Sequence, residues 1–262
     1  MAHPNVTQWD AAGPDGDLGA AAGAFRAGVA RIALAPGGRA VPAHAAAGQE
    51  ELLYVVDGAG SVVQEGRPYA IVAGDCVLHR VATGAQALVA GDGGLTVLAF
   101  GLRAATAAPP AAQRAPAIVA LADVPAGEDR HGRVLQETRI AGRALGAETT
   151  GMRHVRIAPG ALGTPHHCHG AEEELFVVLG GTGAVRLGDE RLPVARGTVV
   201  ARPPGTGVAH SFVAGDEGLE LLGWGTREPN DITYYPDSGK VYLCGVGVIG
   251  RLEPCDYWDG EG

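Results

Sequence analysis

Three histidines and one cysteine occupy four consecutive positions, 166–169, in a chain of 262 residues that has only 9 histidines. On a β-strand, residues two apart face the same side about 6.5–7 Å apart, so His167 and His169 can point toward one ion. Glu174 follows after a short polar stretch, and His210 lies 36 residues further along the chain. Three imidazoles and one carboxylate leave open positions on a six-coordinate divalent ion. The sequence therefore predicts a metal site, with His210 as the best candidate for the fourth ligand.

This mixed set of nitrogen and oxygen donors suits several ions: Fe(II), which we favour, and Mn(II), Ni(II), Cu(II) or Zn(II). We expect one divalent ion per chain. Three side chains that share the inward parity of the ligands should line an apolar cavity around it: Phe176, Val178 and Phe212. Arg202 is a further candidate for the pocket, because a guanidinium can hold a substrate carboxylate by two hydrogen bonds. A rim position without that role is the alternative.

The other polar residues of this stretch have simpler interpretations. We expect Glu172 and Glu173 to be solvated rather than catalytic, and His166 to face outward from a loop. Cys168 has the opposite strand parity to the ligands, so it should fill a small space in the core.

The segments that must position these residues occur twice in the chain. The stretch "EELLYVVDGAG" from Glu50 aligns with "EELFVVLGGTG" from Glu173 at an offset of 123 residues, and Gly74 aligns with Gly197 at the same offset. Each copy contains short apolar runs bounded by Gly, Pro or Asp at a spacing of about ten residues. The sequence therefore predicts an all-β chain with a duplicated antiparallel barrel or sandwich.

The duplication divides the chain into four expected parts. Residues 1–102 form a first barrel, the Ala/Pro-rich residues 103–117 a linker, and residues 118–225 a second, metal-binding barrel. Residues 226–262 form an extension that packs on the barrels or on a subunit neighbour, which would give a homodimer. In this extension "YYPDSGKVYL" predicts a hairpin. A lid role for Tyr234 or Trp258 is one hypothesis, and ordinary packing is the one we favour.

The spacing of the candidate ligands resembles the first motif of the cupin superfamily, G(x)5HxH(x)3–4E(x)6G. His167, His169, Glu174 and Gly181 fit it, whereas Gly160 stands one residue too early. An alternative register with His166 fits the first glycine but would replace a ligand histidine by cysteine.

The second cupin motif, G(x)5PxG(x)2H(x)3N, is matched by Gly197, Pro203, Gly205 and His210. Two extra residues precede the histidine, and Ala214 replaces the asparagine. The chain thus resembles a bicupin, which implies two tandem double-stranded β-helix barrels of the jelly-roll type. The resemblance also implies a metal-dependent enzyme acting on a small organic substrate. We favour oxygenase chemistry as the reaction type, although decarboxylases, isomerases and cyclases of this superfamily share the same ligands. A small-molecule-binding cupin without turnover is the alternative.

The first copy keeps only part of the ligand set. His44 and Glu51 occupy two of the four ligand positions, but Ala46 and Gln86 stand where the other two histidines should be. His79 could replace one of them only in a different strand register. Because each lost imidazole removes a strong donor, we predict a degenerate first barrel that binds no metal and acts as a scaffold.

Composition excludes some partners. The net charge of −9, without a basic stripe, argues against nucleic acid. No uninterrupted apolar run reaches about 18 residues, which argues against a membrane span, and no secretory signal is apparent. We therefore expect a cytoplasmic protein whose partner is a small-molecule substrate. Its four cysteines should be free thiols: Cys76, Cys168, Cys244 and Cys255.

Overall fold

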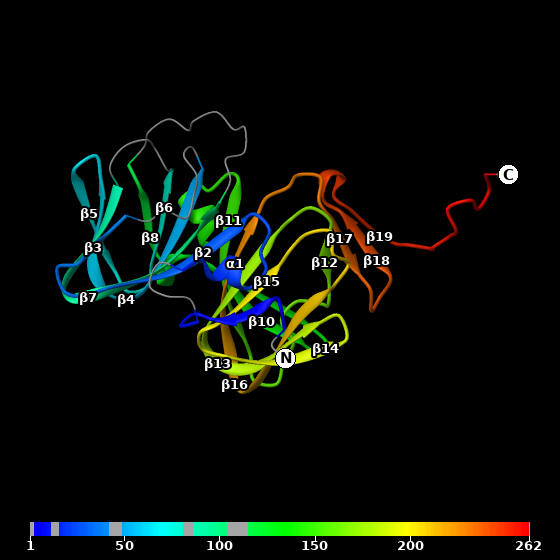
Figure 1. Cartoon of the computed structure of the whole chain (residues 1–262). Coiled ribbons are helices and arrows are strands. Elements are labelled where there is room, and N and C mark those ends of the chain that lie inside the picture. The colour runs from blue at the N-terminus through cyan, green and yellow to red at the C-terminus, as the bar shows by residue number, and fades with distance from the viewer. Residues whose placement is uncertain (1–2, 12–15, 42–48, 81–85, 104–114, 262) are drawn as a thin grey trace.

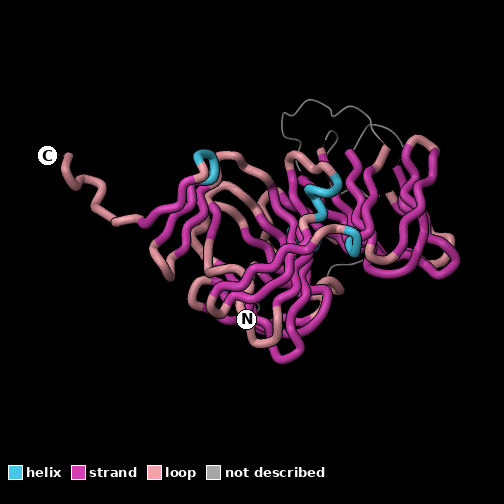
Figure 2. Tube along the Cα trace, turned by 180° about the vertical axis from the view of Figure 1, so that it is seen from behind, coloured by secondary structure: helices cyan, strands magenta, loops and turns pink. Residues whose placement is uncertain are grey.

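The computed structural model describes residues 3–11, 16–41, 49–80, 86–103 and 115–261, and it consists almost entirely of β-strands (Figure 1; Figure 2). The strands form two jelly-roll barrels in tandem, followed by a small third sheet, so the predicted all-β fold is confirmed. The helical elements in the described part of the chain are short: α1 (Leu18–Ala21), η1 (Leu121–Asp123), α2 (Ala141–Leu145) and η2 (Cys244–Val246).

The first barrel is a seven-stranded sheet in the order β2-β7-β4-β6-β8, with β3 paired to β7 and β5 paired to β4. Its strands are β2 (Ala27–Leu34), β3 (Arg39–Ala40), β4 (Glu50–Gln64), β5 (Arg67–Val72), β6 (Asp75–Arg80), β7 (Gln86–Leu102) and β8 (Ala117–Ala120).

The second barrel is an eight-stranded sheet in the order β1-β15-β13-β16-β11-β10-β9, with β14 paired to β13. Its strands are β1 (Val6–Gln8), β9 (Ala126–His131), β10 (Val134–Arg139), β11 (Thr150–Ile157), β13 (Glu174–Leu187), β14 (Glu190–Ala195), β15 (Thr198–Arg202) and β16 (His210–Thr226).

The repeat seen in the sequence is also a repeat of strand register. The β4–β7 pair shifts register between residues 55 and 57 and between 58 and 60, and the β13–β16 pair shifts at the positions 123 residues later. Gly58 and Gly181 lie at these bulges with φ of +81° and +73°, and a Cβ on either would lie 2.2 Å from a carbonyl oxygen of the neighbouring strand. Only glycine fits such a position, which explains why both copies carry one there.

Each barrel has its own apolar interior, and a third cluster joins the two barrels. Leu53 faces the interior of the first barrel, whereas its neighbour Leu52 faces outward into the shared cluster, where Leu175 of the second barrel also lies. Phe100 and Trp224 stack across this shared cluster with ring centroids 6.4 Å apart. Because successive residues alternate between two buried faces, the runs in β4 and β13 are continuously apolar rather than alternating.

The two barrels exchange strands across the expected linker. β1, near the start of the chain, pairs with β15 of the second barrel, and β8, just after the linker, pairs with β6 of the first. The proposed boundaries at residues 1–102, 103–117, 118–225 and 226–262 therefore do not coincide with the two sheets at these strands. β1, which precedes the first barrel in the chain, covers a strand edge of the second barrel. β8, which precedes the second barrel, covers a strand edge of the first.

Two buried glutamates hold the barrels together in the same reciprocal way. Glu173 accepts hydrogen bonds from the backbone N–H groups of residues 25–27 in the first barrel. Glu50, its equivalent in the repeat, accepts from those of residues 148–150 in the second. The expectation of a solvated side chain is wrong for Glu173, which is 0% exposed. A contact with a segment some 150 residues away leaves no local sequence pattern.

The third sheet has the order β12-β17-β18-β19 and lies beside the second barrel (Figure 1). Its strands are β12 (Cys168–His169), β17 (Ile232–Tyr235), β18 (Lys240–Leu243) and β19 (Val248–Arg251). The β17–β18 pair confirms the predicted hairpin, with Tyr235 opposite Lys240. The sheet thus joins the C-terminal extension to the short strand that carries His169. No helix in the described part of the chain is long and apolar enough to cross a membrane.

Candidate metal centre

The four predicted ligands come from three separate segments that meet at one end of the second barrel. His169 lies in β12, Glu174 begins β13, and His210 begins β16. His167 lies opposite His210, and the two residues exchange backbone N–H···O hydrogen bonds of 3.1 and 2.7 Å. Residues paired in this way project to the same side of the ladder, and the centroids of the two rings are 4.5 Å apart.

The donor atoms of these side chains converge. Oε2 of Glu174 lies 3.1 Å from Nε2 of His210 and 3.4 Å from Nε2 of His169. One donor atom from each of His167, His169 and Glu174 lies within 4.8 Å of the others. Atoms that share one ion are spaced in this way, because each donor sits about 2 Å from the metal.

The same atoms lack hydrogen-bond partners, which tests whether a metal fits. Nε2 of His169, Nε2 of His210 and Oε2 of Glu174 are buried without a hydrogen bond of acceptable geometry. Nδ1 of His167 donates to the carbonyl oxygen of Pro165 at 2.7 Å, so its Nε2 carries the lone pair. Buried polar atoms left unpaired are costly, and a divalent cation at their meeting point would satisfy them together. The residues present therefore fit a metal ion.

Burial and mutual charge set the protonation of the ligands. Burial, aided by the neighbouring charge of His210, lowers the pKa of His167 to about 3. Burial also lowers the pKa of His210. It opposes the charge on His169 as well, but the nearby carboxylates of Glu174 and Asp231 raise the pKa of this residue to about 9. Burial would raise the pKa of Glu174, yet the two histidines that face its carboxylate, together with Arg153, hold that pKa well below its usual value. A cation binding here has to displace the proton on Nε2 of His169.

A cavity of about 440 Å³ lies beside the Glu174 carboxylate. Its apolar wall includes Met152, Val155, Ile157, Phe176, Phe212 and Leu221. Two of the residues that the sequence suggested for a pocket, Phe176 and Phe212, are part of this wall. Val178 does not line this cavity but packs in the barrel core. Arg202 lies opposite Glu174 in the strand register but does not line the cavity, and its guanidinium donates to the carbonyl oxygen of Val208.

The comparisons with known proteins agree with this geometry. The family profile of the cupin domain matches residues 153–224, which include all four candidate ligands. This part of the chain, in the second barrel, is a cupin domain. No curated protein matches its sequence significantly.

The fold of the whole chain is similar to that of several solved structures. It is similar to oxalate decarboxylase of Lactobacillus farciminis in its formate complex, with 15% identity, 87% of each chain covered and a TM-score of 0.65. The oxalate decarboxylase of Bacillus subtilis gives 13% identity, 88% of this chain and 80% of that chain, and a TM-score of 0.61. A glyoxylate-induced protein of Pseudomonas aeruginosa gives 16% identity, with 77% of this chain and 74% of that chain covered, and a TM-score of 0.60. At these identities the likeness concerns the fold.

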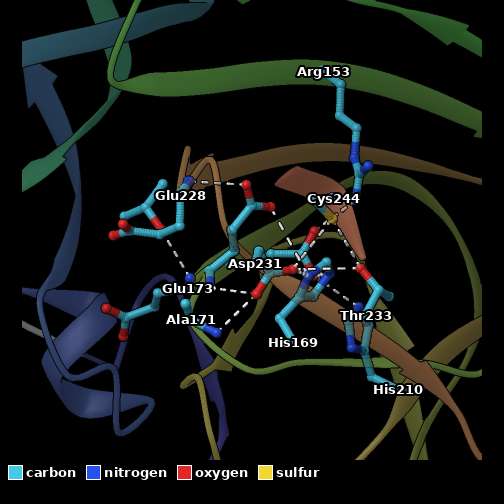
Figure 3. Close-up of polar contacts among 12 residues, drawn as sticks. Arg153, His169, Ala171, Glu173, His210, Glu228, Asp231, Thr233 and Cys244 are labelled. Carbon is cyan, nitrogen blue, oxygen red and sulfur yellow. Dashed lines mark hydrogen bonds and ion pairs between the residues drawn. The ribbon is translucent and has the colours of Figure 1, made fainter. Parts of the chain in front are cut away.

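Three residues of this cupin site were missed by the sequence analysis. Asp231 binds Nδ1 of His169, Arg153 donates to Oε1 of Glu174 at 2.7 Å, and the Tyr235 ring stacks on His167 with centroids 5.7 Å apart (Figure 3 for the first two). Arg153 lies 21 residues before its partner, and Asp231 lies 62 residues after its partner. No spacing rule connects such pairs, so only the tertiary fold reveals them.

Other residues near the site behave differently from what the sequence suggested. His166 is buried at 7% exposure rather than facing outward, and its Nδ1 lies 3.3 Å from Asp237 of the extension. Cys168 is buried, as predicted for a core residue, and burial raises its pKa. Trp258 is 73% exposed and contacts Tyr257, so it is not placed over the cavity. Tyr234 lies opposite Cys168 in the β12–β17 pair, and it is the next residue, Tyr235, that contacts the candidate ligand His167.

The first barrel is described only in part at the corresponding place. His44 and Ala46 lie outside the described residues, as does the side chain of Gln86. Glu51 is opposite His79 in the strand register, just as Glu174 is opposite Arg202 in the second barrel. Nε2 of His79 lies 2.6 Å from Oε2 of Glu51, and both side chains are buried. The register thus follows the repeat, and the absence of metal from this barrel stays a prediction.

Proposed function

We propose that this chain is a metal-dependent enzyme that acts on a small organic substrate in its second barrel. One observation carries the proposal: buried, unpaired donor atoms of His169, Glu174 and His210 converge beside a cavity large enough for a small molecule. A protein that needed only a stable barrel would place apolar side chains here, because unpaired polar atoms are costly. Perturbed titratable groups next to a cavity are typical of functional sites.

The ion would be held by His167, His169, Glu174 and His210, with Fe(II) favoured and Mn, Ni, Cu or Zn as alternatives. A divalent ion with open positions would polarise a carbonyl group, lower the pKa of water or bind dioxygen. Among these, oxygenase chemistry is our leading hypothesis. Decarboxylation, isomerisation and cyclisation are the other classes that the same ligands support.

The residues around the ligands support catalysis by orienting the carboxylate and by excluding water. Arg153 binds Oε1 of Glu174, which leaves Oε2 directed at the histidines. The Arg153 side chain is also 37% exposed and lines the cavity, so its other N–H groups can face a substrate. Phe176 and Phe212 limit access of water from the barrel interior. This combination of one cation and an apolar wall suits a small carboxylate or phenol.

The metal part of the proposal is tested first. Elemental analysis of protein purified without a histidine tag should find about one divalent ion per chain, and His167→Ala and His210→Ala should lose it, since each removes an imidazole donor. His131→Ala, at an exposed position on β9, is the matched control and should keep the ion. Retention of the ion in both ligand variants would show that the ligand set is wrong.

The reaction class is tested with the Fe(II)-loaded protein in an oxygen electrode. A panel of small carboxylates and phenols should include compounds that cause oxygen uptake, and assays for carbon dioxide release or isomerised product cover the other classes. A tightly bound ion without turnover in any assay, and without a ligand-dependent change in its coordination spectrum, would indicate a binding protein instead.

A further inference from the structure

We infer that the C-terminal extension completes the metal centre, and that Asp231 is the residue that positions the ligand His169. The inference rests on the proposed function and concerns how the site is held. It assigns a role to a segment that lies outside the repeat and outside residues 153–224.

Asp231 is placed to hold the imidazole. Its side chain is 0% exposed, and its Oδ2 lies 2.7 Å from Nδ1 of His169 (Figure 3). Its other oxygen, Oδ1, accepts hydrogen bonds from the backbone N–H groups of Ala171 at 2.8 Å and Glu172 at 3.1 Å. The carboxylate is thus fixed by the turn that follows the ligand, and it cannot rotate without breaking these bonds.

The direction of this hydrogen bond determines which nitrogen remains free. A carboxylate can only accept, so Nδ1 of His169 keeps its proton, and Nε2, which faces Glu174, is the nitrogen that an ion would bind in place of a proton. A carboxylate behind a ligand histidine orients the ring and raises its basicity. Glu172 cannot take this role, because its nearest oxygen lies 3.9 Å from the same Nδ1, beyond hydrogen-bonding distance.

The extension also supplies the strand that holds the ligand strand. β12 has only two residues, and in the described part of the chain its strand partner is β17, with His169 opposite Thr233. A two-residue strand has no stability of its own, so its position depends on this pairing. Tyr235 of the same strand stacks on the ring of His167. Two ligand histidines are therefore in contact with the extension.

The test is Asp231→Asn in the full-length protein, with Asp237→Asn as the matched control. Both changes replace a carboxylate of the extension that faces a histidine, but Asp237 contacts His166 and Arg186, neither of which is a candidate ligand. Asparagine at position 231 would direct an NH₂ group at donors that now share the carboxylate. Competition of Zn(II) or Co(II) with a chelator should show about 10–100-fold weaker binding for Asp231→Asn. The control should stay within about twofold of the unsubstituted protein.

Spectroscopy distinguishes a role of Asp231 in positioning His169 from a purely structural role. The visible spectrum of Co(II)-loaded Asp231→Asn should differ from that of the unsubstituted protein, because the orientation of one imidazole changes, whereas Asp237→Asn should leave it unchanged. If Asp231→Asn does not fold, long-range proton–nitrogen NMR of the Zn(II)-loaded parent protein decides: His169 should be protonated at Nδ1 and bound through Nε2.

The outcomes separate the two proposals. Metal binding by the parent protein together with unchanged affinity and spectrum in Asp231→Asn, or binding of His169 through Nδ1, would overturn this inference and leave the proposed function standing. A parent protein that binds no divalent ion would overturn the proposed function, and this inference with it.

Discussion

Replacement of Glu173 by alanine should weaken the contact between the two barrels more than any single exposed substitution could. The carboxylate is fully buried and accepts three backbone N–H groups from residues 25–27. Of these donors, the N–H of Ala27 is completely buried, while those of Phe25 and Arg26 are partly exposed and can regain water. The effect of the substitution therefore depends mainly on one orphaned N–H and the space left beside it.

The magnitude follows from these contacts. An unpaired buried N–H costs about 1–3 kcal/mol, and the two partly exposed bonds add less than that each, so Glu173→Ala should lower the free energy of unfolding by roughly 2–4 kcal/mol. The neighbouring Glu172 has a 28% exposed side chain and accepts one backbone N–H, so Glu172→Ala should cost about 1 kcal/mol or less.

Urea unfolding followed by tryptophan fluorescence and circular dichroism measures both values. Because the shared core contains residues of both barrels, we expect one transition for the unsubstituted protein. Glu50→Ala should behave like Glu173→Ala, and the double variant should be close to additive, since the two carboxylates bind different segments. A loss below about 1 kcal/mol for Glu173→Ala, or a loss equal to that of Glu172→Ala, would refute the reasoning.

Three further predictions follow from the structure. Burial would raise the pKa of Glu50, but hydrogen bonds from Glu148, Thr149 and Thr150 lower this pKa below its ordinary value of 4.5. The carboxylate therefore contributes its full stability above pH 4.5, and this contribution is lost as the pH falls through the folded-state pKa. The decline of stability at acid pH, measured by urea titration, should be shallower in Glu50→Gln. Burial raises the pKa of Cys76 to about 12, so in native protein at pH 8 a disulfide reagent should modify the exposed Cys255 quickly and Cys76 only after unfolding; rapid modification of Cys76 would contradict its burial. Phe100→Ala, in the cluster between the barrels, should cost about 3–5 kcal/mol in calorimetry while leaving the metal content unchanged, and loss of the ion would mean that the cluster also shapes the site.

Much of the fold was predictable because its signals are local or repeated. The offset of 123 residues between the two copies predicted two equivalent barrels, and the glycines of that repeat lie at equivalent bulges. The spacing from His167 to Glu174 reflects one strand and one bend, so the side chains that meet there can be inferred from strand parity. His210 could be predicted as the fourth ligand because the second motif, which spans the loop before β16, includes a histidine.

The tertiary structure alone decided which distant segments support these residues. Asp231, Arg153 and the carboxylate of Glu173 each bind a partner 20 to 150 residues away, through geometry that neither strand parity nor a motif encodes. The same is true of β1 and β8, whose pairing with the opposite barrel depends on which sheet edge is open. Local sequence determines the period and parity of a strand, whereas a long-range contact depends on how all strands pack around a common core.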